Sequence, residues 1–388
     1  MSTTAQVPVP ASIWNWVTTI GTTRKLTTED HRRIERWSAG DSAPTINQLS
    51  NLSSKLEIPF GYFFLTEPID DAPAMFAHRT IRNASIDRPS QNLIDTLDDM
   101  QAVQDWMRQD AIDRGDTPLP FVGSQHTDHA DIMSLATAIR KQLGMPTGWY
   151  SSNGRCLPVD EAFTCLREYC AGAGIIVMLN GIVRDNTHRT LDPQEFRAFA
   201  LIDEYAPLIF INRADSRHGQ IFSLAHEIVH VWLGEEEIYN DEYRHADNAP
   251  VEVLCNAVAA ELIMPQQEFI REWKHAEGDT TNAIMNELTQ SFPVSPVVIA
   301  RRALDGHLIS QDAYDRIVAE SARQWEERTA SSSGGNYYST KRSRLDHRFV
   351  EHLAASLSEG RTSYTDAYRL TGTNRKTFSK LLDTMGVR

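Results

Sequence analysis

The stretch Gly219-Gln220-Ile221-Phe222-Ser223-Leu224-Ala225-His226-Glu227-Ile228-Val229-His230-Val231-Trp232-Leu233-Gly234 decides how the middle of this chain is interpreted. His226 and His230 are four residues apart, so on a helix both imidazoles point the same way and can bind one Zn²⁺. Glu227 would lie beside the metal, where its carboxylate can take a proton from water. This spacing is typical of a metallopeptidase.

The residues around the motif predict a helix with one buried face. Four apolar residues recur at helical spacing: Phe222, Ala225, Val229 and Leu233. Gly234 stands where a helix end is expected, and Asp215 or Ser216 could cap its start. The alternative is a core helix that carries two histidines by chance. That alternative is disfavoured, because buried histidines and a buried glutamate are costly without a partner such as a metal.

A zinc site of this kind needs a third protein ligand and one position left for water. The longer motif with a third histidine fails, because Leu233 and Glu236 stand where its glycine and histidine would be. Residues 250–265 predict a second helix, bounded by prolines. On it, Glu252 is our choice for the third ligand, with Asn256 one turn later to orient it. Glu261 is the competing carboxylate.

At this point the chain resembles the ImmA/IrrE family of metallopeptidases. The resemblance is carried by three phrases: Ala206-Pro207-Leu208-Ile209-Phe210-Ile211-Asn212, His226-Glu227-x-x-His230, and Glu252-x-x-Cys255-Asn256-x-x-Ala259-x-x-Leu262-x-Met264-Pro265. It implies that Glu252, and not Glu261, takes the ligand position. Cys255 replaces the usual alanine; it can pack as a small apolar residue, and its thiol could also add a ligand.

Elements upstream of the motif complete an α+β catalytic domain, which we expect over residues 130–328. Short apolar runs rich in β-branched residues predict strands at 174–179 and 206–211, with a third at 197–202. Helical spacing predicts helices at 130–144 and 159–171. A small β-sheet with two active-site helices is the zincin-like (gluzincin) layout.

The first part of the chain, residues 1–70, predicts a helical domain. The segment from Pro44 to Leu56 looks like the second half of an XRE-type helix-turn-helix (HTH) domain, with Leu49, Leu52 and Leu56 on its core face. Its basic residues could touch DNA phosphates. The alternative is a helical bundle that binds protein.

Residues 71–129 are expected to form a connecting helix and a linker. An apolar stripe that includes Leu93, Leu97 and Met107 predicts the helix, which could connect domains, form a dimer or pack on its own domain. The stretch 115–127, with Pro118 and Pro120, has the composition of a linker.

The end of the chain differs in charge from the rest. Residues 329–340 have the composition of a flexible linker. Residues 341–388 hold ten Lys or Arg against five Asp or Glu, in a chain whose net charge is −14. The module has HTH proportions, with Arg375, Lys376 and Lys380 on its second helix. It could meet nucleic acid or an acidic partner, or it could be a basic bundle that caps the acidic catalytic domain.

Composition and leader analysis favour a cytoplasmic protein that does not enter a membrane. The first twenty residues lack a cationic start followed by an apolar run, and no apolar run reaches membrane-spanning length. The four cysteines show no Cys-x-x-Cys spacing, so neither a thiol zinc knuckle nor a redox pair is expected.

The expected activity is that of a zinc metalloendopeptidase. Zn²⁺ held by His226, His230 and Glu252 would lower the pKa of water towards about 7, and Glu227 would act as the base. A further donor must stabilise the oxyanion, and the candidates are Tyr239, Tyr243, His245 and His218.

The resemblance implies a protein substrate, typically an XRE-type repressor or antitoxin, cleaved in a phage, mobile-element or stress response. An alternative is a DNA-binding transcriptional regulator or antitoxin whose peptidase-like domain acts as a sensor. A third is an interaction protein in which any metal is structural. DNA binding through the terminal domains and a homodimer are left open.

Overall fold

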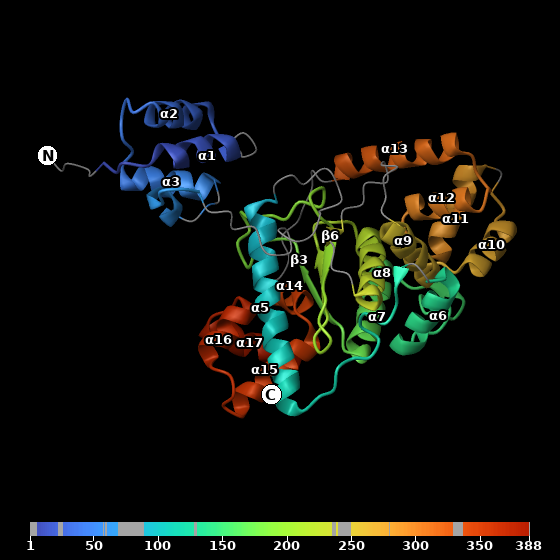
Figure 1. The fold of residues 1–388 in the computed structure, drawn as a ribbon. Helices are drawn as coiled ribbons and strands as arrows, with labels where there is room; N and C mark the ends of the chain where they lie inside the picture. Colours follow the sequence, from blue (N-terminus) through green and yellow to red (C-terminus); the bar gives the residue numbers. More distant parts are fainter. Residues whose placement is uncertain are drawn as a thin grey trace. The chain divides into compact units, whose positions relative to one another are not determined.

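The computed structural model describes residues 6–21, 26–56, 58, 60–68, 89–127, 130–234, 238–239, 250–278, 280–328 and 337–387 (Figure 1). The chain divides into two compact units, Met1–His78 with Arg88–Asp95, and Arg79–Asp87 with Thr96–Arg388. The first unit is helical, and the second combines helices with a small sheet. The expected α+β class is therefore confirmed.

The first unit is a bundle of short helices around two tryptophans. Its elements are α1 Ala11–Gly21, α2 Thr28–Ser38, α3 Ile46–Leu56 and the 3₁₀ helix η1 Phe60–Phe64. The rings of Trp14 and Trp37 lie 5.7 Å apart, and Leu49, Leu52 and Leu56 are buried in the same core, as expected. The HTH interpretation of this unit stays a prediction.

The sheet of the second unit has the strand order β3-β5-β4-β6. Its strands are β3 Ile176–Asn180, β4 Ala198–Leu201, β5 Leu208–Asn212 and β6 Ile238–Tyr239. β3 runs parallel to β5, whereas β4 is antiparallel to both its neighbours. Nearly all residues of β3, β4 and β5 are buried, which explains why their sequences are continuous apolar runs. The three predicted strands are confirmed.

Helices pack against this sheet and against one another. The two that carry the candidate site are α8 Arg217–Leu233 and α9 Pro250–Ile263; α8 packs on β4, β5, α7 and α9. A two-residue hairpin, β1 Ser151–Ser152 with β2 Arg155–Cys156, precedes α7. The other helices of this region are α6 Ile132–Leu143, α7 Val159–Ala173, α10 Gln266–His275, α11 Thr281–Ser291, α12 Pro296–Asp305 and α13 Gln311–Arg328.

Both predicted ends of the motif helix α8 are confirmed. At its start, the Ser216 hydroxyl accepts a hydrogen bond of 3.0 Å from the N–H of Gly219, so Ser216 rather than Asp215 is the cap. At its end, Gly234 takes the left-handed conformation, with φ of 70°. A side chain there would also come within 2.9 Å of the backbone of Gly123. Both the left-handed backbone and the lack of space for a side chain therefore require glycine at this position.

The segment 115–127 is packed structure rather than a free linker. Phe121 stacks on Trp232 of α8 with ring centroids 4.5 Å apart. The N–H of Gly123 bonds the carbonyl of Val231, and that of Gln125 bonds the carbonyl of Trp232, both at 3.0 Å. The last carbonyls of a helix have no partner within it. This segment supplies two of those partners for α8.

Helix α5, Gln91–Arg114, packs on the second unit from Thr96 onwards. The buried side-chain amide of Gln104 donates to the carbonyls of Leu201 and Ala206, at 2.8 and 3.1 Å. Leu97 and Met107 are buried, as the apolar stripe predicts. The helix also runs through both units, with Gln91–Asp95 in the first and Thr96–Arg114 in the second, as expected of a connecting helix. Dimer formation stays a prediction.

The C-terminal helices are α14 Tyr337–Arg344, α15 His347–Ser358, α16 Tyr364–Thr371 and α17 Arg375–Met385 (Figure 1). α15 lies against α5, where the rings of Phe349 and Trp106 are 5.9 Å apart. The C-terminal helices also cover the outer edge of β3. Asp346 accepts a hydrogen bond of 3.1 Å from the N–H of Val177, and Arg167 donates to the Val177 carbonyl at 2.7 Å. The same guanidinium bonds the carbonyl of Ser343 at 2.8 Å, so it links the module to the strand.

In the part of the chain that the structure describes, no helix combines the length and apolar character needed to cross a bilayer.

Candidate metal centre

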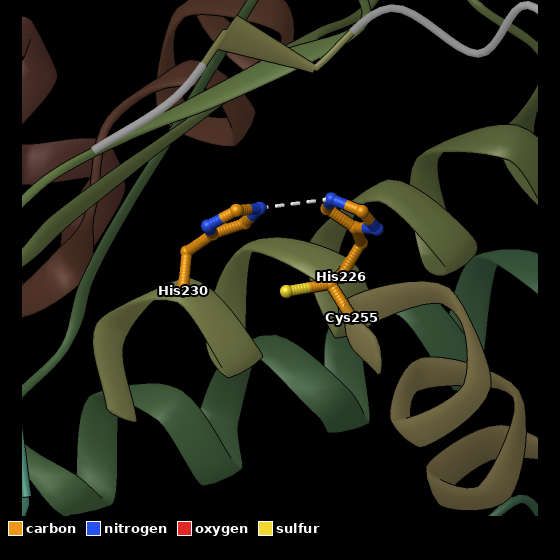
Figure 2. Close-up of side chains that lie close together, drawn as sticks. All are labelled: His226, His230 and Cys255. Carbon is orange, nitrogen blue, oxygen red and sulfur yellow. Dashed lines mark hydrogen bonds between the residues drawn. The ribbon is translucent and has the colours of Figure 1, made fainter. Parts of the chain in front are cut away.

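Two imidazoles from successive turns of α8 face each other inside the second unit. His226 and His230 are both buried, and their Nε2 atoms lie 3.0 Å apart (Figure 2). The ring planes are tilted by 49°. Two ring nitrogens aimed at one point are what a shared metal ion requires, and the four-residue spacing on a helix produces this arrangement.

Glu252 on α9 brings a carboxylate to the same point. Its oxygens lie 3.2 Å from Nε2 of His230 and 3.4 Å from Nε2 of His226. Bonds of about 2.0–2.1 Å to a tetrahedral Zn²⁺ place the ligand atoms about 3.3 Å from one another. The three observed separations agree with that value. The residues present therefore fit a zinc ion.

The electrostatics of this cluster favour the ionised form of Glu252. Burial raises the pKa of its carboxyl group, but His226 and His230 outweigh burial and hold that pKa well below its usual range. Metal ligands must be deprotonated to bind, so Glu252 is in its binding form at neutral pH.

Glu227 is fully buried next to His226 on α8. Burying a carboxylate is costly, and acidic side chains are almost never fully buried without partners. A structural metal site needs no additional carboxylate at this position. A buried carboxylate one residue from a candidate metal ligand suggests a role in chemistry.

The sequence suggested that Asn256 orients Glu252. In the structure, the Asn256 side chain contacts His226 instead. Its Oδ1 lies 3.0 Å from Nδ1 of His226. An amide oxygen accepts hydrogen bonds, so Nδ1 carries a proton, and in a neutral ring Nε2 then keeps the lone pair that a metal needs. The helical spacing placed Asn256 on the correct face of α9, but spacing could not choose between two neighbouring partners.

Glu261, the competing third ligand, is engaged elsewhere. Its carboxylate is buried, forms an ion pair with Arg302 of α12 and accepts a hydrogen bond of 3.1 Å from the N–H of Gln266. Arg302 also donates to the carbonyl of Met264 at 2.8 Å. Glu261 therefore joins α9 to α12 and lies outside the imidazole cluster.

Cys255 does reach the imidazoles. The sulfur and one ring nitrogen each of His226 and His230 lie within 4.8 Å of one another, and all three side chains are buried. Figure 2 shows the sulfur directed towards the space beside the two rings. Two candidate ligand sets thus share the histidines, one completed by Glu252 and one by Cys255. The replacement of the family's alanine by cysteine was the sequence signal for the second set.

Three of the four candidate oxyanion donors have no described side chain. Tyr243 and His245 lie outside the described residues. Tyr239 belongs to β6, but its side chain is also outside the described part. His218 is in the first turn of α8, eight residues before His226, which is about 12 Å along the helix axis. The choice of donor therefore stays open.

Two family models match parts of this chain. Residues 173–304 match a peptidase family model described as IrrE N-terminal-like domain, and residues 345–384 match a model described as a domain of unknown function. No curated protein and no solved structure matches the chain. The first match runs from β3 to α12 and holds every residue of the cluster. It supports the resemblance to the ImmA/IrrE family for this central region and suggests a metallopeptidase-like activity.

Proposed function

We propose that the chain is a zinc-dependent endopeptidase. The observation that carries the proposal is the convergence of His226 Nε2, His230 Nε2 and the Glu252 carboxylate at separations of 3.0, 3.2 and 3.4 Å. The Glu227 carboxylate lies one residue from this cluster, in the protein interior. Three protein ligands with an adjacent base are the arrangement of a catalytic rather than a structural zinc site.

The proposed chemistry divides between the metal and the side chains. When bound, Zn²⁺ acts as a Lewis acid that polarises a peptide carbonyl and lowers the pKa of water to about 7. Glu227 takes the proton from the attacking water and passes it to the amine that leaves. Asn256 keeps the proton of His226 on Nδ1, which leaves Nε2 free for the metal.

We further propose that the substrate is a specific regulatory protein, an XRE-type repressor or an antitoxin. This part rests on the resemblance of the central domain to the ImmA/IrrE family. Cleavage of such a protein would release its targets in a phage, mobile-element or stress response. The first candidate to test is a transcription factor encoded beside the gene for this chain.

The test compares the native chain with Glu227→Gln. Both proteins should bind one zinc per chain, because the proposed role of Glu227 is to transfer a proton and not to bind the metal. Only the native chain should cut the neighbouring transcription factor into fragments that mass spectrometry can identify, and a chelator should stop it. Glu320→Gln, an exposed glutamate of α13, is the matched control and should cut normally. Undiminished cleavage by Glu227→Gln would overturn the role given to this residue.

A further inference from the structure

The last three helices form a small module with its own core. α15, α16 and α17 pack through buried apolar side chains: Phe349, Val350, Leu353, Ala367, Leu370, Phe378, Leu381 and Met385. A tight turn joins α16 to α17. In it, Gly372 is left-handed with φ of 60°, and Asn374 caps α17 in a capping box with Thr377. A helix, a short glycine-containing turn and a second helix in this order are typical of an HTH unit.

α17 has two faces of opposite character. Its inner face carries Phe378, Leu381 and Met385, which recur at helical spacing and are buried. Its outer face is polar and exposed, and it carries Arg375, Lys376, Ser379, Lys380 and Asp383. Three of these five residues are cationic, and all three lie in the first two turns. The N-terminal half of α17 therefore presents a basic surface to solvent.

Two sets of basic residues stand out in the C-terminal helices. One set docks the module: Lys341 and Arg344 of α14 form ion pairs with Asp185, and Arg361 forms one with Asp110. The other set is on α17. Among the residues that the structure describes, Arg375 and Lys376 form no ion pair. Docking thus accounts for the first set and leaves the charges of Arg375 and Lys376 unexplained.

The docking contacts also fix the orientation of the turn. The buried Lys341 ammonium bonds both Asp185, at 2.9 Å, and the carbonyl of Gly372, at 3.3 Å. His347 contacts the carbonyl of Met385 at 3.2 Å, so both ends of α17 are held against α14 and α15. A recognition element works best when rigid neighbours support it.

We propose that this module, residues 345–387, binds double-stranded DNA. The outer face of α17 would enter the major groove, which is wide enough for one α-helix. Arg375, Lys376 and Lys380 would contact phosphates and base edges, and Ser379 offers a hydroxyl between them. The whole chain is acidic, with a net charge of −14, so we expect the contact to be confined to this basic face. This proposal does not depend on the metal centre.

The character of the surface favours DNA over an acidic protein. Stable protein interfaces have an apolar centre, commonly built from aromatic residues. In the described part of the module, Tyr364 at the start of α16 is the one large apolar side chain that is exposed, and α17 itself exposes none. A helix face made of cations and a hydroxyl matches phosphates and base edges.

The test uses the full chain and labelled DNA duplexes of about 30 base pairs with a randomised centre. Binding should be detectable at about 50 mM salt and should weaken steeply by about 200 mM, as counterion release requires. Repeated selection from the pool should then enrich a common sequence. Replacing Arg375, Lys376 and Lys380 together with serine should weaken binding at least tenfold. The slope of log K against log salt should fall by about 2 to 3.

A second triple variant provides the matched control. Arg271, Lys274 and Arg301 are exposed cations on α10 and α12, so their replacement by serine makes the same change in net charge. This variant should bind DNA as the native chain does, and so should Glu227→Gln. The proposal is overturned if the native chain fails to bind duplex DNA or if the α17 variant binds normally. Equal weakening of both triple variants, or equal binding of single strands, would also overturn it.

Discussion

The side-chain oxygen of Asn256 lies 3.0 Å from Nδ1 of His226, on the side of the ring opposite to Glu252. Because the two ring nitrogens of a neutral histidine have opposite roles, this one contact determines which of them carries the proton. It also resists rotation of a ring whose other nitrogen must meet a metal.

Replacing Asn256 with alanine should therefore weaken zinc binding about 10- to 100-fold, the usual effect of removing a hydrogen-bond partner of a ligating histidine. Competition with a chromophoric chelator would measure the change. Asn256→Asp keeps an acceptor at the same place and should bind zinc at least as tightly as the native chain. Equal affinity of the alanine and native proteins would contradict the role given to Asn256.

Glu252 and Cys255 make different predictions about the third ligand. If Glu252 is that ligand, Glu252→Ala should lose zinc on dialysis, whereas Cys255→Ala should retain it. Replacing zinc with Co²⁺ gives an independent readout, because a coordinated thiolate adds an intense near-ultraviolet band. We expect no such band in the native chain. A strong band that Cys255→Ala removes would show that the sulfur binds the metal.

The buried pair of Glu261 and Arg302 predicts a large effect on stability. Their side chains are 3% and 11% exposed, so Glu261→Ala leaves a buried guanidinium without its partner. The expected cost is about 3–5 kcal/mol in the free energy of unfolding. The exposed pair of Arg301 and Asp305 is the control, and Arg301→Ala should cost less than about 1 kcal/mol. Denaturant unfolding of the two variants would compare them.

In the first unit, Asp30 predicts a stability that depends on pH. Burial raises the pKa of this carboxyl group, but hydrogen bonds from Lys55 and Thr27 outweigh burial and lower it from 3.8 to about 2. Because the pKa is lower in the folded state, the stabilisation is present above pH 3.8 and is lost as the pH falls towards 2. Lys55 is partly exposed, so the contribution at neutral pH is about 1 kcal/mol.

Asp30→Asn should accordingly speed hydrogen exchange in α2 and α3 at pH 7, and the difference from the native chain should shrink towards the acid end of this window. Glu29→Gln alters an exposed ion pair with Arg33 on the same helix, and it should change exchange much less. If the effect of Asp30→Asn were the same at pH 7 and near pH 3, the carboxylate would not be its source.

Local patterns predicted the central domain well. The cap at Ser216, the stop at Gly234 and the strands around Val177 and Ile209 all depend on a few neighbouring residues, which sequence displays directly. The face that Glu252 shares with Asn256 follows from helical spacing in the same way. The structure brings Glu252 to both histidines, although its role as a ligand stays a prediction.

Contacts between distant segments were beyond these patterns. No sequence pattern near Gly123 predicts that its N–H bonds the carbonyl of Val231, so the segment was interpreted as a linker. Helical spacing likewise could not show that Asn256 meets His226 or that Glu261 meets Arg302, because each partner comes from another helix. Such pairings are fixed by how the helices pack.

The contact of Asp346 and Arg167 with Val177 has a practical consequence for anyone who isolates the peptidase region. A fragment limited to residues 173–304 would lack both side chains. It would expose the unpaired N–H and carbonyl groups of β3, the outer strand of the sheet. Such an edge is a template for a strand from another molecule, so the fragment should self-associate into aggregates. A well-behaved fragment will need to begin before α7 and to extend through the C-terminal helices.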